Sequence, residues 1–162
     1  MMLYTADLWD TYSDRLTLLN ISLNTYGRAD TFHGEVVTLK VYEDNSLVKQ
    51  TLQTDGVGKV LVVDGGGSKR CALVGDNLAQ LAIDNNWNGL IIYGSIRDAK
   101  QINSMNIGIK ALGTCPVKSV KRNVGLKGID LLIEGTRIKH GAFLYADTDG
   151  MLLADELLSL DA

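Results

Sequence analysis

Three charged side chains bracket one stretch of the chain, GDNLAQLAIDNNWNGLIIYGSIRD at residues 75–98. Asp76 opens an apolar helical pattern, and Arg97 and Asp98, separated from it by twenty residues, follow an apolar strand pattern. An arginine can hold a carboxylate through two parallel hydrogen bonds, and an aspartate can ligate a hard divalent cation. If the fold brings the three together, they form a site for an anionic, metal-chelating small molecule.

Asp76 has two compatible interpretations. An aspartate just before an apolar helix is the ordinary N-cap, whose side chain accepts a backbone N–H. The same helix start also offers unpaired N–H groups that suit a carboxylate or a phosphate. These groups belong to Gly75, Asp76, Asn77 and Leu78. Capping and anion binding can occur at one helix start.

Arg97 and Asp98 also have two interpretations. Neighbouring opposite charges on a surface often form a pair that contributes little. However, the apolar runs 60–63 and 90–93 are typical of buried parallel strands. Because consecutive parallel strands tend to be neighbours, both strand ends and the helix start are expected at one edge of the sheet, where α/β folds bind ligands.

Other motifs carry weaker signals. The triple glycine 65–67 follows a buried strand but matches neither G-x-x-x-x-G-K-[ST] nor G-x-G-x-x-G, so a tight turn with positive φ is favoured over a ligand loop. Ser68 lacks the G-x-S-x-G context of a nucleophile elbow. His33 and His140 show no zinc-ligand spacing.

Composition restricts the class of protein. With 162 residues, 46% hydrophobic and 22% charged, the chain fits one soluble globular domain. A net charge of -3 argues against nucleic acid as a direct ligand. Two cysteines, Cys71 and Cys115, in apolar surroundings favour a reducing cytoplasm over a disulfide framework. Neither a secretory leader nor an apolar run long enough to cross a bilayer is expected.

The periodic patterns predict one mixed α/β domain over residues 1–162, with a central βαβαβ section between β-rich ends. The helix at Asp76 or Asn77 should bury Leu78, Leu81, Ala82 and Trp87, with a turn at Asn88-Gly89. The expected helices are 5–12, a segment from residues 44–46 to Gly56, the one beginning at residue 76 or 77, and 99–106. The expected strands are 35–42, 60–63, 90–93, two short pieces within 107–117, and antiparallel strands after Gly125.

Three features together resemble the RraA-like family, which includes the regulator of ribonuclease activity A and the class II 4-hydroxy-4-methyl-2-oxoglutarate aldolases. The features are GKVLVVDGGGSKRCALVGDNLAQLA, the spacing of Asp76 from Arg97-Asp98, and LYADTDGMLLAD. The resemblance covers nearly the whole chain. It implies a swivelling β/β/α domain with a mixed central sheet, assembled as a homotrimer with sites at subunit interfaces.

The resemblance also implies roles for the bracketing residues. Backbone N–H groups of residues 75–78 bind a small 2-oxo acid, Arg97 binds its pyruvyl part, and Asp98 ligates Mg²⁺ or Mn²⁺. Asp76 positions or deprotonates a water. Retro-aldol cleavage of 4-hydroxy-4-methyl-2-oxoglutarate then yields two pyruvates through an enolate, and oxaloacetate decarboxylation passes through the same enolate.

One position departs from the enzymatic pattern. Many enzymatic relatives carry an acid where this chain has Gln101, and the loss of that carboxylate can weaken the surroundings of the metal. The alternative function is a non-catalytic regulator that binds and inhibits ribonuclease E. Some members of that branch lose the aspartate that this chain retains as Asp98, and its retention favours the aldolase.

Overall fold

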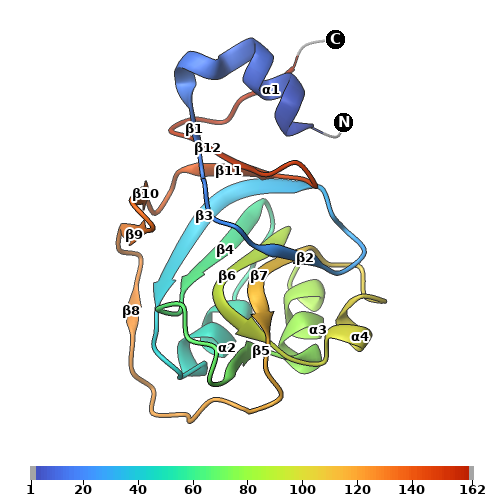
Figure 1. The fold of residues 1–162 in the computed structure, drawn as a ribbon, viewed down its shortest axis with the longest axis vertical. Coiled ribbons are helices and arrows are strands. Elements are labelled where there is room, and N and C mark those ends of the chain that lie inside the picture. The colour runs from blue at the N-terminus through green and yellow to red at the C-terminus, as the bar shows by residue number, and fades with distance from the viewer. Residues whose placement is uncertain (1–2, 161–162) are drawn as a thin grey trace.

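The structure is a computed structural model that describes residues 3–160, built on one mixed sheet (Figure 1). The strands follow the order β1-β12-β11-β3-β4-β6-β7-β2, with β5 beside β6 and β8 beside β3. These strands are β1 (Leu16–Leu18), β2 (Asn24–Tyr26), β3 (Phe32–Lys40), β4 (Lys59–Asp64), β5 (Ala72–Val74), β6 (Gly89–Ile96), β7 (Ile109–Thr114), β8 (Leu126–Lys127), β11 (Phe143–Ala146) and β12 (Met151–Ala154). A separate hairpin pairs β9 (Leu131–Ile133) with β10 (Thr136–Ile138).

Within the described residues, α1 precedes the first strand, and the other helices lie between the strands that pair in parallel. They are α1 (Thr5–Tyr12), α2 (Ser46–Leu52), α3 (Asp76–Asp84) and α4 (Ala99–Ile102), and a 3₁₀ turn, η1, covers Ser13–Arg15. β3, β4, β6 and β7 pair in parallel. Parallel strands require crossover connections, and α2, α3 and α4 supply them.

The domain has the three layers expected of a β/β/α fold. Helices α2, α3 and α4 lie on one side of the parallel strands (Figure 1), and their buried residues form one core cluster with them. A second cluster on the opposite face joins the parallel strands to β9–β12. Both faces of the central strands are therefore covered, which is why β4 and β6 are apolar almost throughout.

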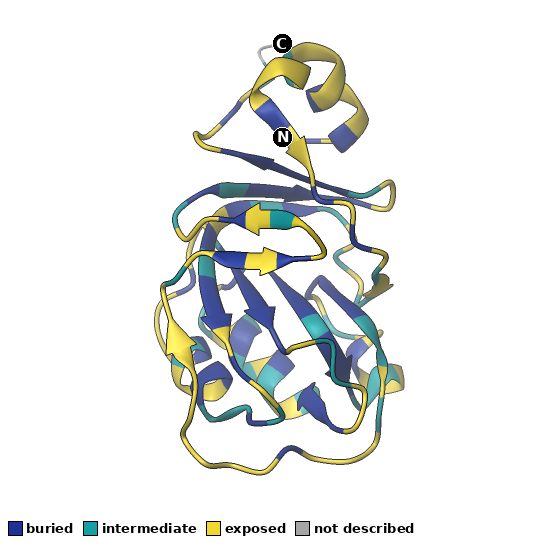
Figure 2. Cartoon of the chain, turned by 60° about the vertical axis from the view of Figure 1, so that its left-hand side comes forward, coloured by how far each residue is buried: buried dark blue, intermediate teal, exposed yellow. Residues whose placement is uncertain are grey.

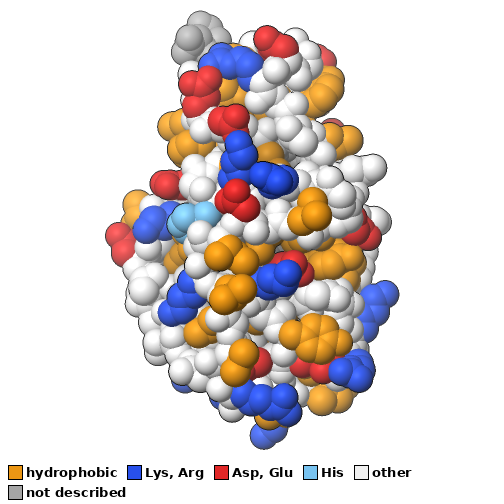
Figure 3. Space-filling model, turned by 90° about the vertical axis from the view of Figure 1, so that its left-hand side faces the viewer, with side chains coloured by type: hydrophobic (Ala, Val, Ile, Leu, Met, Phe, Trp, Pro, Cys, Tyr) orange, Lys and Arg blue, Asp and Glu red, His pale blue; other side chains and the backbone are white. Residues whose placement is uncertain are grey.

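The central sheet is buried, whereas the long segment between β7 and β8 (residues 115–125) is mostly exposed. Figure 2 shows buried residues along the central strands and exposed residues on α1 and on the segment that leads to β8. The face over β8–β10 also carries apolar side chains among its charges (Figure 3). Val124, Leu126 and Leu132 are exposed there.

Most expected elements are confirmed, with shifted boundaries. Residues 5–12 are helical, and Leu47, Val48 and Leu52 of α2 are buried as expected. That helix ends at Leu52, before the expected Gly56. Ala82 and Trp87 are buried, whereas Leu78 and Leu81 are half-buried because they face the pocket described below.

Several strand predictions were wrong. Residues 107–117 contain the single strand β7 instead of two pieces, because β7 pairs with β6 on both sides of one shift in register. The strand expected at 35–42 spans Phe32–Lys40, and Gly89 begins β6 instead of ending a turn. β1, β2 and β5 were not predicted, since three-residue strands have no periodicity of their own and exist through pairing. Residues 1, 2, 161 and 162 of the predicted domain lie outside the described residues.

Candidate functional site

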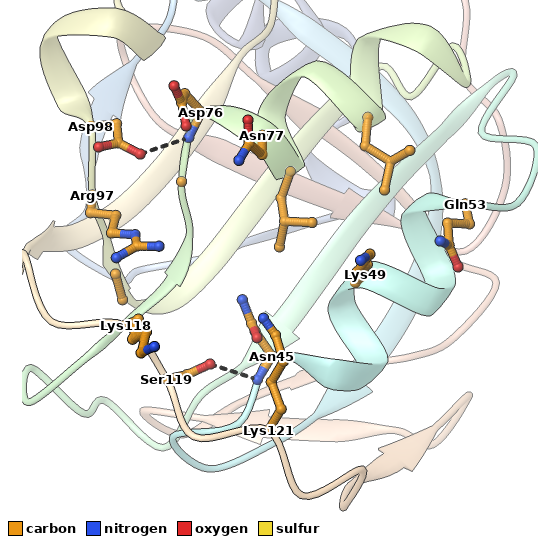
Figure 4. Close-up of a pocket in the computed structure, with 14 residues that line it drawn as sticks. Asn45, Lys49, Gln53, Asp76, Asn77, Arg97, Asp98, Lys118, Ser119 and Lys121 are labelled. Atoms are coloured by element: carbon orange, nitrogen blue, oxygen red, sulfur yellow. Dashed lines mark hydrogen bonds between the residues drawn. The ribbon is translucent and has the colours of Figure 1, made fainter.

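A pocket of about 340 Å³ opens where β5 and β6 end and α3 begins (Figure 4). All six residues expected from the sequence line it. They are Gly75, Asp76, Asn77, Leu78, Arg97 and Asp98. The fold therefore places the helix start and the Arg-Asp pair in one cavity of a single chain.

Pairing between β5 and β6 creates this proximity. The two strands are parallel with Val74 opposite Ile96, and the Arg97 N–H donates to the Val74 carbonyl at 2.9 Å. Gly75 directly follows β5 and lies close to the side chains of Arg97 and Asp98. A Cβ on Gly75 would lie 2.8 Å from Asp98 Oδ2 and 3.3 Å from Arg97 Cγ, so only glycine leaves both side chains where they are.

Asp98, and not Asp76, caps α3. The Asp98 Oδ2 accepts the Asp76 N–H at 3.1 Å, and Gly75 occupies the N-cap position without a side chain. The expectation that Asp76 or Asn77 caps this helix was therefore wrong. Asp98 reaches the helix start because its backbone is left-handed, with φ of 59°. A non-glycine residue in that region carries a small strain, which aspartate tolerates better than most residues.

The cap leaves several groups free at the helix start. The carboxylate of Asp76 has no hydrogen-bond or ion-pair partner within residues 3–160, and Oδ1 of Asp98 has none there either. The N–H groups of Asn77 and Leu78 lie in the first turn, where an α-helix offers no internal acceptor. Together these groups offer both acceptors for a cation and donors for an anion.

The carboxylates of Asp98 and Asp76 suit a hard divalent cation that keeps most of its waters. They are too few for a site in which protein side chains supply every ligand. Across residues 3–160, no group of three or more His, Cys, Asp or Glu side chains could hold a metal ion. Mg²⁺, however, is commonly bound by one or two carboxylates while it keeps several waters. Asp98, with Asp76 beside it, can supply those carboxylates.

The opposite wall of the pocket is basic, which the sequence patterns do not predict. Lys49 of α2 and Lys121 line this wall together with Asn45, and Lys118 also lines the pocket (Figure 4). From the sequence, Asn45 is expected only at the start of the helix that begins within residues 44–46. Scattered lysines carry no spacing signal, so only the packing of residues 117–121 against β5 and the start of α2 could reveal this wall.

The triple glycine forms a turn, as favoured. Gly66 and Gly67 have φ of 68° and 73°, and none of residues 65–67 lines the pocket. Ser68 donates a hydrogen bond to Glu43, which also receives two from Arg70. The hydrogen bonds from Arg70 and Ser68 lower the pKa of Glu43 to about 2.

The two histidines have separate structural contacts. His33 stacks on Tyr145 with ring centroids 5.6 Å apart, and burial lowers the pKa of His33. The Nδ1 of His140 accepts the Thr38 N–H at 3.2 Å. Neither histidine lines the pocket, and Gln101 lies exposed on α4 outside its lining.

Comparison with known proteins gives a consistent family and three different activity names. The model of the RraA-like family, described as Aldolase/RraA, matches residues 5–153. A Vibrio parahaemolyticus protein with the provisional name 4-hydroxy-4-methyl-2-oxoglutarate aldolase is 47% identical over 95% of this chain and 96% of its own. An Aromatoleum aromaticum protein with the same provisional name is 48% identical over 98% and 99%.

Two solved structures share the whole fold. The RNA-processing inhibitor RraA from Thermus thermophilus matches with a TM-score of 0.94 and 41% identity, covering 98% of this chain and 96% of its own. A Geobacillus kaustophilus protein described as S-adenosylmethionine:2-dimethylmenaquinone methyltransferase matches with a TM-score of 0.94 and 46% identity, covering 96% and 97%. In the part of the chain that the structure describes, no helix has the length and apolar character needed to span a membrane.

Proposed function

Because the chain belongs to the RraA-like family, we propose that it is a divalent-cation-dependent aldolase that cleaves 4-hydroxy-4-methyl-2-oxoglutarate to two pyruvates. We include decarboxylation of oxaloacetate as a second reaction of the same site. The observation that carries this proposal is the convergence of Arg97, Asp98 and the start of α3 in one pocket. A 2-oxo acid presents a carboxylate beside a keto oxygen. Arg97 and the N–H groups at the start of α3 offer hydrogen-bond donors for both.

Different residues of the pocket bind the substrate, stabilise the enolate and accept the proton. Arg97 and the N–H groups of Asn77 and Leu78 bind the carboxylate next to the keto group. Breaking the C3–C4 bond moves its electron pair toward the keto oxygen, and the fixed charge of Arg97 stabilises that developing enolate. Asp76 accepts the proton of the C4 hydroxyl through a water. Protonation of C3 then completes the first pyruvate, and C4 becomes the keto carbon of the second.

Asp98 is the residue that would hold the divalent cation, with Asp76 as a neighbouring carboxylate. A cation at this place supplies electrophilic stabilisation of negative charge on the keto oxygen. Oxaloacetate loses carbon dioxide to give the same pyruvate enolate, so the same donors serve both reactions. The exposed Gln101 lies outside the pocket lining, and its amide keeps a polar group without the charge of the acid in many enzymatic relatives.

The charge of the pocket favours an anionic substrate over the sulfonium donor in the name of the Geobacillus protein. Four cationic side chains, Arg97, Lys49, Lys118 and Lys121, line it against the two carboxylates Asp76 and Asp98. An excess of positive charge repels a cationic sulfonium, and the described lining includes no aromatic side chain on which an adenine could stack.

A coupled assay tests the proposal on the purified protein. Pyruvate is measured with 4-hydroxy-4-methyl-2-oxoglutarate or oxaloacetate, in Mg²⁺, in Mn²⁺ and after treatment with a chelator. We expect turnover with either metal, loss of turnover with chelator, and recovery when metal is returned. No pyruvate from either substrate in either metal would contradict the proposal.

A second candidate function has its own support in the Thermus structure described as an RNA-processing inhibitor. This chain would then bind ribonuclease E and reduce RNA processing through its outer surface, leaving the pocket free for catalysis. A pull-down with the ribonuclease and its partner proteins tests it. The absence of association at micromolar concentration would remove this candidate.

Assembly and location remain predictions. The homotrimer is implied by the family resemblance, and the exposed apolar side chains on the face over β8–β10 (Figure 3) support a contact with another protein chain, because such patches often mark contacts between proteins. Light scattering coupled to size exclusion measures the mass directly, and a monomer would contradict the trimer. A cytoplasmic location remains an expectation from cysteine usage.

A further inference from the structure

The basic wall of the pocket has more positive charge than the pyruvyl part of a substrate requires. Arg97 and the start of α3 already provide donors for one carboxylate. Lys49, Lys118 and Lys121 line the pocket in addition, and their ammonium groups have no hydrogen-bond or ion-pair partner among residues 3–160. The chain as a whole carries a net charge of -3, so this local excess is not a general property of its surface.

Asn45 contributes an unused acceptor on the same wall. Its Nδ2 donates to the Leu73 carbonyl at 3.0 Å, which fixes the orientation of the amide. Its Oδ1 is buried and lacks a partner in the described structure. A buried acceptor without a donor loses the hydrogen bonds it would make to water and gains none in return, which is unfavourable. Asn45 comes from the same side of the pocket as Lys121 (Figure 4), and an ammonium group is a donor that could satisfy Oδ1.

The backbone on either side of Lys121 is held in place although its side chain is free. The Asn45 N–H donates to Ser119 Oγ at 3.1 Å, and the Val120 N–H donates to the Glu43 carbonyl at 3.2 Å. Asp44 Oδ2 accepts two further N–H groups, from Arg122 at 2.8 Å and Val124 at 3.1 Å. Lys121 is thus carried by an anchored segment that faces the pocket, not by a loose loop.

We propose that Lys49 and Lys121 bind the second carboxylate of a dicarboxylic substrate, with Asn45 Oδ1 accepting one N–H of Lys121 as a positioning contact. The inference rests on the proposed function, because it assigns the far end of the same substrate. Arg97 holds the carboxylate beside the keto group, and the basic wall holds the one at the other end. The enzyme therefore selects 2-oxo dicarboxylates over 2-oxo monocarboxylates of equal length.

A pair of unreactive ligands tests this selection without turnover. 2-Oxoglutarate has both carboxylates but no C4 hydroxyl, so it has no retro-aldol route, and 2-oxopentanoate has the same chain without the second carboxylate. Affinities are measured by calorimetry in Mg²⁺ for the wild type and for Lys49→Met/Lys121→Met. We expect the wild type to bind 2-oxoglutarate about tenfold more tightly or better. The double variant should lose this preference and retain its affinity for 2-oxopentanoate.

Lys69→Met is the matched control, because Lys69 is exposed and does not line the pocket. It should bind both ligands as the wild type does. Asn45→Ala should weaken 2-oxoglutarate several-fold in the wild type and have no further effect in the Lys121→Met background. A purely structural role of Asn45 would instead weaken both ligands in both backgrounds.

The outcomes separate this inference from the proposed function. Equal affinity of the wild type for the two ligands, together with metal-dependent pyruvate release, would overturn the subsite and leave the aldolase standing. An unchanged preference in the double variant would also overturn the subsite. Failure to bind either ligand, with no pyruvate release, would overturn both.

Discussion

At the scale of single residues, Asp98 has two tasks in one position. Its Oδ2 accepts the Asp76 N–H and so caps α3, while its Oδ1 has no partner within residues 3–160 and is a candidate ligand for a cation. The left-handed backbone at Asp98 turns the carboxylate back toward the helix start. Substitutions can separate the two tasks, because capping needs an acceptor oxygen and cation binding needs charge.

Asp98→Asn should keep the cap and lose the cation. An asparagine oxygen still accepts the Asp76 N–H, so we expect the free energy of unfolding to change by less than about 1 kcal/mol. Mn²⁺ affinity, measured by water proton relaxation, should fall at least about tenfold, and pyruvate release should fall with it. Asp98→Ala, which removes both functions, should also destabilise the protein. Wild-type Mn²⁺ affinity in Asp98→Asn would exclude Asp98 as a ligand.

Arg97→Lys should preserve charge and lose activity. The planar guanidinium can donate two parallel hydrogen bonds to a carboxylate, whereas an ammonium group is a single point of charge. We expect kcat/KM for 4-hydroxy-4-methyl-2-oxoglutarate to fall by about 10²–10³. Thermal unfolding monitored by circular dichroism should be unchanged. Retention of more than half of the activity would show that the planar donor pair is not used.

At the scale of elements, the site depends on β5, a strand of three residues. Its pairing with β6 brings Gly75 against Arg97 and Asp98, and α3 then starts at the pocket wall. The absence of a side chain at Gly75 permits this approach. Its φ of -117° is open to any residue, so the requirement concerns space and not backbone conformation.

Gly75→Ala should disturb the site and spare the fold. The new Cβ would lie 2.8 Å from Asp98 Oδ2, so the carboxylate must move and release the Asp76 N–H. We expect Mn²⁺ affinity and kcat/KM each to fall at least about tenfold, with less than about 2 kcal/mol lost in stability. Gly113→Ala is the control, because nothing lies within 4 Å of its added Cβ. Equal effects of both substitutions would contradict this argument.

At the scale of the whole molecule, buried carboxylates join segments that are distant in sequence. Asp147, at the end of β11, accepts hydrogen bonds from the N–H and hydroxyl of Thr5 at 2.8 and 2.7 Å, across 142 residues. Asp44 accepts bonds from the segment that carries Lys121. Burial opposes ionisation of both groups, but their hydrogen bonds outweigh it and lower the pKa of Asp147 and, to about 2, that of Asp44.

Stability should therefore fall in acid. A carboxylate whose pKa is lower in the folded state stabilises the protein above its unfolded pKa, 3.8 for aspartate, and this contribution is lost as the pH falls toward the folded value. Between about pH 5 and pH 2, we expect Asp44 alone to account for about 2 kcal/mol. Urea unfolding at several pH values measures the slope. Asp44→Asn should flatten it, and parallel curves for variant and wild type would contradict this assignment.

The sequence by itself determined the central part of the fold and one wall of the pocket. Long apolar runs such as 60–63 and the helical pattern after Asp76 have a periodicity that each element carries alone. Because parallel strands end at one edge, the same patterns predicted that Arg97 and Asp98 would meet the start of α3. The resemblance to a family added the identity of the chemistry expected there.

Only the tertiary structure decided which carboxylate caps α3 and what forms the opposite wall. Asp98 caps the helix through a left-handed backbone conformation that sequence patterns do not encode. Asn45, Lys49 and Lys121 come from two segments more than seventy residues apart, brought together by hydrogen bonds to Asp44 and Ser119. Hydrophobic periodicity indicates which face of a single helix or strand is buried. A pocket wall depends on contacts between segments, and those exist only in the folded chain.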